Sequence, residues 1–201
     1  MLAIAGGKGG VGKTTTTLGI GLALLARRRD PVLVDADVDA PNLHLVADVP
    51  DDGVAALAEG ASVEDAATPA SRFGGVRVLG SYPGAPVRRA IRGLTTDRPV
   101  IVDSPPGASR DAVFPLRIAD HAVVVTTPEP QAVRDAATTA RVAATVGTPV
   151  VAWIVTRSAT VPERVAAAAG STPVVPVPAT RSPALGARRA YDEAATAWVN
   201  A

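Results

Sequence analysis

The chain has 201 residues, of which 47% are hydrophobic and 3% aromatic, and this is long enough for one sizeable core. Its 20 basic and 19 acidic side chains leave a formal charge of +1, which excludes a strong overall field for gathering nucleic acid or anionic lipid. The absence of cysteine excludes disulfides, thiolate metal sites and iron–sulfur clusters on this chain.

Short apolar runs rich in β-branched residues recur along the chain, separated by stretches of helical pattern. Their near-continuous apolarity predicts strands that are covered on both faces, as in a parallel sheet with helices on each side. The predicted strands are 2–5, 32–35, 76–79, 100–103, 122–126, 150–155 and 174–177, and the predicted helices are 13–28, 131–144, 162–169 and a final helix 183–199.

The remaining long segment, 50–98, is punctuated by glycines, which predict loops and small helices around one strand. The fold class is therefore α/β, a single domain with a mostly parallel sheet of about seven strands and helices on both faces. We expect residues 1–201 to form this one domain. The sequence shows no signal peptide and no apolar run near the roughly 20 residues that span a bilayer, which predicts a cytoplasmic protein.

A glycine-rich loop follows the first predicted strand directly and satisfies the G-x-x-x-x-G-K-[ST] pattern, which predicts that the domain is a P-loop NTPase. It consists of Gly7, Lys8, Gly9, Gly10, Val11, Gly12, Lys13 and Thr14. Glycines let backbone N–H groups turn toward phosphate oxygens, and the helix beginning at Lys13 directs its positive dipole end at the same charge. We predict that Lys13 reaches the β- and γ-phosphates of ATP and that the Thr14 hydroxyl ligates Mg²⁺.

Lys8 places a second cation inside this loop. It is interpreted either as a solvated side chain or as a group that reaches phosphates, which belong to its own nucleotide or to that of a facing subunit.

Acidic side chains follow the second and fourth predicted strands. Asp35 and Asp37 end the second strand, and Asp103 ends the fourth, before a loop that runs to Gly107. The carboxyl ends of parallel strands border the crevice where ligands bind. We predict that Asp35 and Asp103 belong to the Mg²⁺ site and that Asp37 orients the attacking water. For Asp39, a role in the site and a role as the cap of a turn are equally compatible with the sequence. A backbone amide at Gly107 would sense the γ-phosphate and make its loop a switch.

Taken together, these residues resemble the MinD/ParA family of deviant Walker ATPases over nearly the whole chain. The resemblance rests on the run from Lys8 to Thr15 with its early signature lysine, on Asp35 to Asp37 and Asp103 to Gly107 as the two switches, and on Thr127 to Pro130. It implies a homodimer with ATP sandwiched between the subunits, in which Lys8 contacts the partner's nucleotide and Asp37 positions water. It also implies slow hydrolysis, stimulated by an activating partner protein, in the positioning or partitioning of a cellular cargo.

Two departures from the family pattern concern the base pocket and the partner surface. Family members usually carry an asparagine after the sixth strand, where this chain has Thr156 and Arg157. We predict that Arg157 stacks on the purine and that Pro176, Val177 and Pro178 close the base pocket, with adenine or guanine left open. The stretch 84–98 is shorter than in many relatives, which predicts a reduced partner surface.

Other readings of the sequence remain open. The runs 35–44 and 103–107 are also similar to iron–sulfur carriers, whose cluster cysteines this chain lacks. A nucleotide-dependent binding module with negligible turnover and a cofactor amidase or ligase are further alternatives.

Membrane or DNA association has only weak support. The C-terminal stripe of Ala184, Ala187, Tyr191, Ala195 and Trp198 favours core packing over peripheral membrane binding, and the arginines available for DNA are Arg72, Arg88, Arg89 and Arg92. His44 and His121 are interpreted as structural residues.

Overall fold

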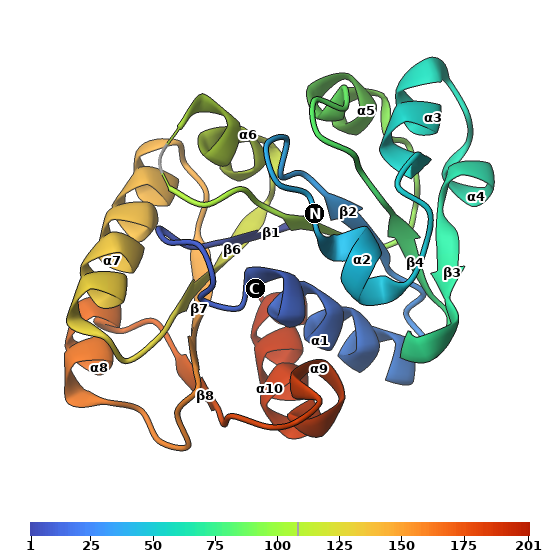
Figure 1. Ribbon diagram of the computed structural model, residues 1–201. Coiled ribbons are helices and arrows are strands. Elements are labelled where there is room, and N and C mark those ends of the chain that lie inside the picture. Colours follow the sequence, from blue (N-terminus) through green and yellow to red (C-terminus); the bar gives the residue numbers. More distant parts are fainter. Residues whose placement is uncertain (108) are drawn as a thin grey trace.

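The fold is built around one sheet, and the computed structural model describes residues 1–107 and 109–201 (Figure 1). Its strands are β1 (Leu2–Ala5), β2 (Val32–Asp35), β3 (Thr68–Ala70), β4 (Val76–Leu79), β5 (Val100–Asp103), β6 (His121–Thr126), β7 (Val150–Thr156) and β8 (Val174–Val177). Their order in the sheet is β3-β4-β2-β5-β1-β6-β7-β8, and all neighbouring pairs are parallel except β3 with β4. All seven predicted strands are confirmed.

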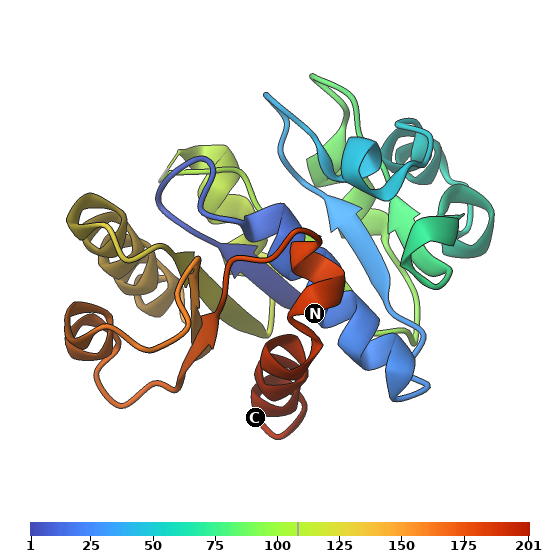
Figure 2. The same cartoon turned by 60° about the horizontal axis from the view of Figure 1, so that its bottom comes forward.

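Helices cover both faces of this sheet. They are α1 (Lys13–Ala26), α2 (Leu43–Ala47), α3 (Gly53–Glu59), α4 (Val63–Ala66), α5 (Val87–Gly93), α6 (Arg110–Ile118), α7 (Pro130–Thr145), α8 (Glu163–Ala169), α9 (Pro183–Gly186) and α10 (Arg188–Val199), with a 3₁₀ turn η1 (Ser71–Phe73). One face packs against α1, α2, α9 and α10, and the other against α3 to α8. In Figure 2 the blue helix α1 and the red helices α9 and α10 lie side by side.

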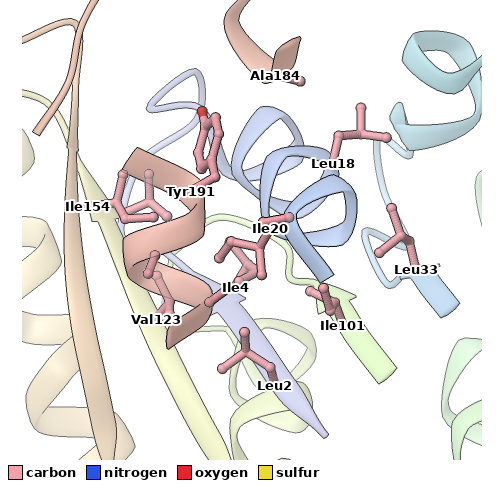
Figure 3. Packing of buried hydrophobic residues seen from close by; sticks show 14 of the residues in the cluster. Leu2, Ile4, Leu18, Ile20, Leu33, Ile101, Val123, Ile154, Ala184 and Tyr191 are labelled. Atoms are coloured by element: carbon pink, nitrogen blue, oxygen red, sulfur yellow. The ribbon is translucent and has the colours of Figure 1, made fainter. Parts of the chain in front are cut away.

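The packing of α1 against α10 anchors the helix that begins at the glycine loop (Figure 3). The ring of Tyr191 is fully buried and lies so close to Gly19 that any side chain at Gly19 would overlap it. Ala184, Ala187 and Ala195 are also buried, and Trp198 packs partly against the same cluster. The prediction that this stripe packs into the core is therefore confirmed.

Three elements differ from the sequence-based expectations. The predicted single helix 183–199 is wrong, because Ala187 leaves helical geometry and divides it into α9 and α10. Segment 50–98 holds two strands instead of one. The additional strand β3 is three residues long and has Pro69 at its centre, which the sheet tolerates because β3 is an edge strand. The unpredicted helix α6 contains Pro115, which removes one helical hydrogen bond and weakens the sequence signal.

The described part of the chain, residues 1–107 and 109–201, contains no helix with the length and apolarity needed to cross a membrane.

Candidate functional site

The glycine loop connects β1 to α1 at the carboxyl edge of the sheet. Gly10 and Gly12 adopt φ angles of 74° and 100°, in the left-handed region that glycine enters without steric cost. Gly12 also precedes the first turn of α1, where no side chain caps the helix and no acidic residue lies in the first turn. The free N–H groups at this helix end therefore suit an anion such as phosphate.

Lys13 is the first residue of α1, and its side chain turns back toward the glycine loop. Its side chain is buried, and its Nζ donates to the carbonyl oxygen of Lys8 at 3.4 Å. Burial lowers the pKa of Lys13 below its ordinary value, while the nearby charges of Asp103 and Asp37 partly offset that change. A buried ammonium with one long hydrogen bond is a strong electrostatic site for phosphate oxygens.

Lys8, by contrast, has an exposed side chain, and its amine makes no ion pair within the described residues. Its position at the mouth of the loop leaves it able to reach outward from the protein.

Asp35 and Asp103 lie on neighbouring strands, β2 and β5, and are paired in register. Burial raises the pKa of Asp103 to about 7, with a partial offset from Thr14. Burial also raises the pKa of Asp35 to about 6, although its carboxylate accepts N–H groups of Leu43 at 2.9 Å and Asp37 at 3.2 Å. Two adjacent buried carboxylates favour protonation unless a cation lies near them.

One oxygen of Asp103, Oδ1, is buried without a hydrogen-bond partner in the described structure. Thr14 supplies a hydroxyl nearby, which donates to Asn42 Oδ1 at 2.7 Å. No group of three or more His, Asp or Glu side chains among the described residues forms a metal site by itself. This donor set fits Mg²⁺, which commonly takes one or two protein oxygens and completes its octahedron with water and phosphate.

The raised pKa of Asp103 gives a prediction about stability without nucleotide or metal. Because the folded carboxyl keeps a proton that the unfolded chain has released, the free energy of unfolding falls as pH rises from about 4 toward 7. We expect the free energy of unfolding of Asp103→Asn, measured relative to the wild type, to increase by roughly 2–4 kcal/mol from pH 4.5 to pH 8. Urea unfolding at both pH values measures this, with the exposed-site variant Asp51→Asn as control. A stability difference that is independent of pH would contradict it.

Asp37 is half-buried, and its Oδ1 accepts the backbone N–H groups of Asp39 at 3.2 Å and Ala40 at 3.1 Å. The turn cap considered for Asp39 is thus made by Asp37, while the Asp39 side chain is exposed. The charge of Asp37 is nonetheless felt by Lys13 and Asp103, which places it beside the same phosphate region.

Thr156 and Arg157 hold the glycine loop from the end of β7. The Thr156 hydroxyl donates to Val11 O at 2.7 Å and approaches Thr126 O at 3.2 Å, and the Arg157 guanidinium donates to Gly10 O at 2.8 Å. Both residues also line a cavity of about 240 Å³ beside the start of α1. Stacking of Arg157 on a purine stays a prediction, since its guanidinium is engaged with the loop here.

The cavity beside Thr156 lies where the base pocket is predicted. It is lined by Gly12, Thr15, Thr156, Arg157, Val177, Pro178, Ala179, Thr180, Pro183 and Tyr191. Pro176 lies in β8 outside this lining. The Thr180 and Tyr191 hydroxyls are buried without partners in the described structure, and burial raises the pKa of Tyr191 to about 12. Burial therefore keeps the Tyr191 hydroxyl in its neutral form.

Sequence reasoning missed three residues of this site: Asn42, Thr180 and Tyr191. Asn42 stands directly after Pro41 in the acidic run, and Thr180 lies two residues after Pro178. Tyr191 was assigned to the core alone. Their roles depend on contacts between distant segments, such as the bond from Thr14 to Asn42.

Comparison with known proteins agrees with this geometry. Residues 2–172 match the model of the CobQ/CobB/MinD/ParA nucleotide binding domain. The septum site-determining protein MinD of Synechocystis is 33% identical over 155 residues, which is 68% of this chain and 56% of that protein. MinD of Bacillus subtilis is 33% identical over 151 residues, 67% of this chain and 56% of that protein. The chain thus spans about half the length of these curated relatives.

Solved structures give the same result at the level of the fold. The cell division ATPase MinD of Pyrococcus furiosus matches with a TM-score of 0.83 and 25% identity, over 99% of this chain and 98% of that one. Cobyrinic acid a,c-diamide synthase of Mycobacterium smegmatis, with bound ATP analog and magnesium, matches with a TM-score of 0.77 and 25% identity, over 99% and 93%. The family model, the relatives and the geometry of the loop agree, and the chain belongs to the MinD/ParA family of P-loop ATPases.

Proposed function

We propose that this chain binds ATP with Mg²⁺ in the loop from Gly7 to Thr14, hydrolyses it slowly, and uses the two nucleotide states as a dimerisation switch. The observation that carries the proposal is the convergence of Lys13, Asp35 and Asp103 below an uncapped helix start. A positive helix end, a buried ammonium and two buried carboxylates meet at one point, which suits a polyphosphate with its cation.

Each residue has a distinct part in the proposed reaction. Lys13 and the N–H groups of the loop hold the phosphate oxygens, and Thr14 and Asp103 hold the cation, with Asp35 behind them. Mg²⁺, when bound, neutralises charge that develops on the phosphates. The Thr14 hydroxyl would ligate the cation through an oxygen lone pair while its proton is still donated to Asn42 Oδ1 at the start of α2. Asp37 accepts a hydrogen bond from the attacking water and directs it at the γ-phosphate.

Dimerisation is proposed from Lys8. This exposed cation belongs to the loop itself but makes no ion pair within the described structure, so it is available to the phosphates of a second copy. If the partner copy completes the site in this way, the two subunits associate more tightly with ATP bound than with ADP bound. The septum site-determining relatives support a role in positioning a cellular cargo, with an activating partner protein as a further part of the proposal.

Magnesium-dependent release of phosphate from ATP tests the catalytic part. We expect slow turnover that EDTA abolishes and excess Mg²⁺ restores, because Thr14 and Asp103 act on phosphate only through the cation. Tight binding of ATP without turnover would contradict the ATPase and favour the alternative, a nucleotide-dependent partner-binding module. The cobyrinic acid a,c-diamide synthase similarity covers the same nucleotide-binding fold and by itself supports the phosphate site alone.

A further inference from the structure

Helices α5 and α6 lie on the face of the sheet opposite α1 (Figure 1). Side chains of these two helices line a basic groove. Its volume is about 700 Å³. Four exposed arginines form its walls, and three apolar side chains lie between them; in chain order the lining residues are Arg88, Arg92, Arg110, Val113, Phe114, Arg117 and Ile118. We call this feature the arginine groove. It falls partly in the stretch 84–98, whose shortness predicted a reduced partner surface.

Two of these arginines are held in place by one aromatic ring. The guanidinium carbons of Arg88 and Arg92 lie 5.2 and 5.9 Å from the centroid of Phe114, which is itself 7% exposed. Cation–π contact at this distance orients the guanidinium groups and reduces their freedom. Less conformational entropy is therefore lost when an anion binds to them.

The groove already binds one carboxylate of its own chain. Asp111 Oδ1 accepts two hydrogen bonds from Arg88, one from Nε at 3.3 Å and one from Nη2 at 3.0 Å. Within residues 1–107 and 109–201, Arg92, Arg110 and Arg117 have no acidic partner. These three guanidinium groups are thus available to bind carboxylates, and the pairing of Arg88 with Asp111 shows the geometry of such a contact.

The form of the groove separates three classes of anionic partner. Nucleic acid would gain phosphate contacts, but the groove offers no open aromatic face for bases because Phe114 is buried under two guanidinium groups. An anionic membrane is a broad surface, and the large exposed hydrophobic residues of the described structure lie outside the groove. A protein segment can fill a concave site with both carboxylates and apolar side chains, and it meets Val113 and Ile118 as well as the arginines.

We propose that the arginine groove is a docking site for an acidic segment of a partner protein, in which carboxylates alternate with apolar side chains. The carboxylates pair with Arg92, Arg110 and Arg117, and the apolar side chains contact Val113 and Ile118. Because α6 is the first helix after β5, the strand that ends at Asp103, an occupant of the groove would contact the helix next to the predicted nucleotide site.

Fluorescence anisotropy with a labelled peptide, in which two glutamates precede each leucine, tests the proposal without nucleotide. The result is therefore independent of the proposed ATPase. We expect saturable binding that weakens by at least about tenfold in Arg92→Glu/Arg117→Glu, since two charge-assisted contacts become repulsive. The matched control Arg134→Glu/Arg141→Glu on α7 makes the same change in net charge and is expected to bind within about twofold of the wild type.

A second variant distinguishes the loss of specific contacts from misfolding of the protein. Arg92→Lys/Arg117→Lys keeps the charge but removes the planar fork, and we expect intermediate affinity with an unchanged circular dichroism spectrum. Absence of saturable binding to the wild-type protein, or equal weakening in the α7 control, would overturn the proposal. Duplex DNA or phosphatidylglycerol vesicles that bind through Arg92 and Arg117 more tightly than the peptide would overturn it in favour of that partner class.

Discussion

Replacing Lys13 with alanine is expected to weaken binding of ATP with Mg²⁺ by roughly tenfold to a hundredfold, the effect of losing a charge-assisted contact to phosphate. The buried amine has one weak hydrogen bond, to Lys8 O, so its charge remains available for a ligand. Burial disfavours that charge in the protein without ligand, and its removal is therefore not expected to lower stability. Isothermal titration calorimetry measures the affinity, and thermal unfolding verifies the fold.

Lys8→Ala is the matched control for this experiment, because Lys8 and Lys13 are the only two lysines in the sequence. Lys8 is exposed, and we expect its removal to change the affinity of the monomer for ATP by less than about threefold. Equal loss in both variants would show that the loop responds to its total charge. Unchanged binding in Lys13→Ala would remove Lys13 from the phosphate site.

Substitution of Asp37 is expected to separate binding from hydrolysis. A positioned acid or base contributes about 10²–10⁴ in rate, so Asp37→Asn should lower single-turnover phosphate release by at least about a hundredfold. ATP affinity should stay within about threefold, since Asp37 is not assigned to hold phosphate. Release of phosphate from a preformed complex with ATP measures the rate, and calorimetry measures the affinity.

Asparagine is chosen because Asp37 also caps a turn. Its Oδ1 accepts the N–H groups of Asp39 and Ala40, and the amide oxygen of asparagine preserves both bonds. Asp37→Ala removes the charge and the cap together. An Asn variant that hydrolyses ATP like the wild type, next to an inactive Ala variant, would limit Asp37 to a structural role.

Local sequence patterns were sufficient for the elements that surround the site. Seven strands were predicted because each is a short β-branched run, and the glycine loop because its spacing dictates its chemistry. The sequence did not predict strand β3 or helix α6. These elements contain Pro69 and Pro115, and proline disfavours the structure in which each occurs. The sheet and the helix packing override that local preference.

The parts of the site that were not predicted depend on long-range contacts. Thr156 and Arg157 bond to carbonyl oxygens of Val11 and Gly10, more than 140 positions earlier in the chain. The sequence showed that these two residues replace the expected asparagine and predicted that Arg157 stacks on the purine, but it did not indicate their bonds to the glycine loop. Likewise, the bond between Thr14 and Asn42 exists because β1 and β2 end at the same edge of the sheet, each beside β5. Such partners require the three-dimensional arrangement.

The central claim is that ATP joins two copies of this chain through Lys8, and the molecular mass in solution tests it most directly. Light scattering after size exclusion would measure the mass of Asp37→Asn with Mg²⁺ and ATP, with ADP, and without nucleotide, since this variant is expected to bind ATP and hydrolyse it very slowly. The account predicts a dimer with ATP alone, and a monomer when Lys8→Ala is added. A monomer under all three conditions, or an ATP dimer that survives Lys8→Ala, would contradict it.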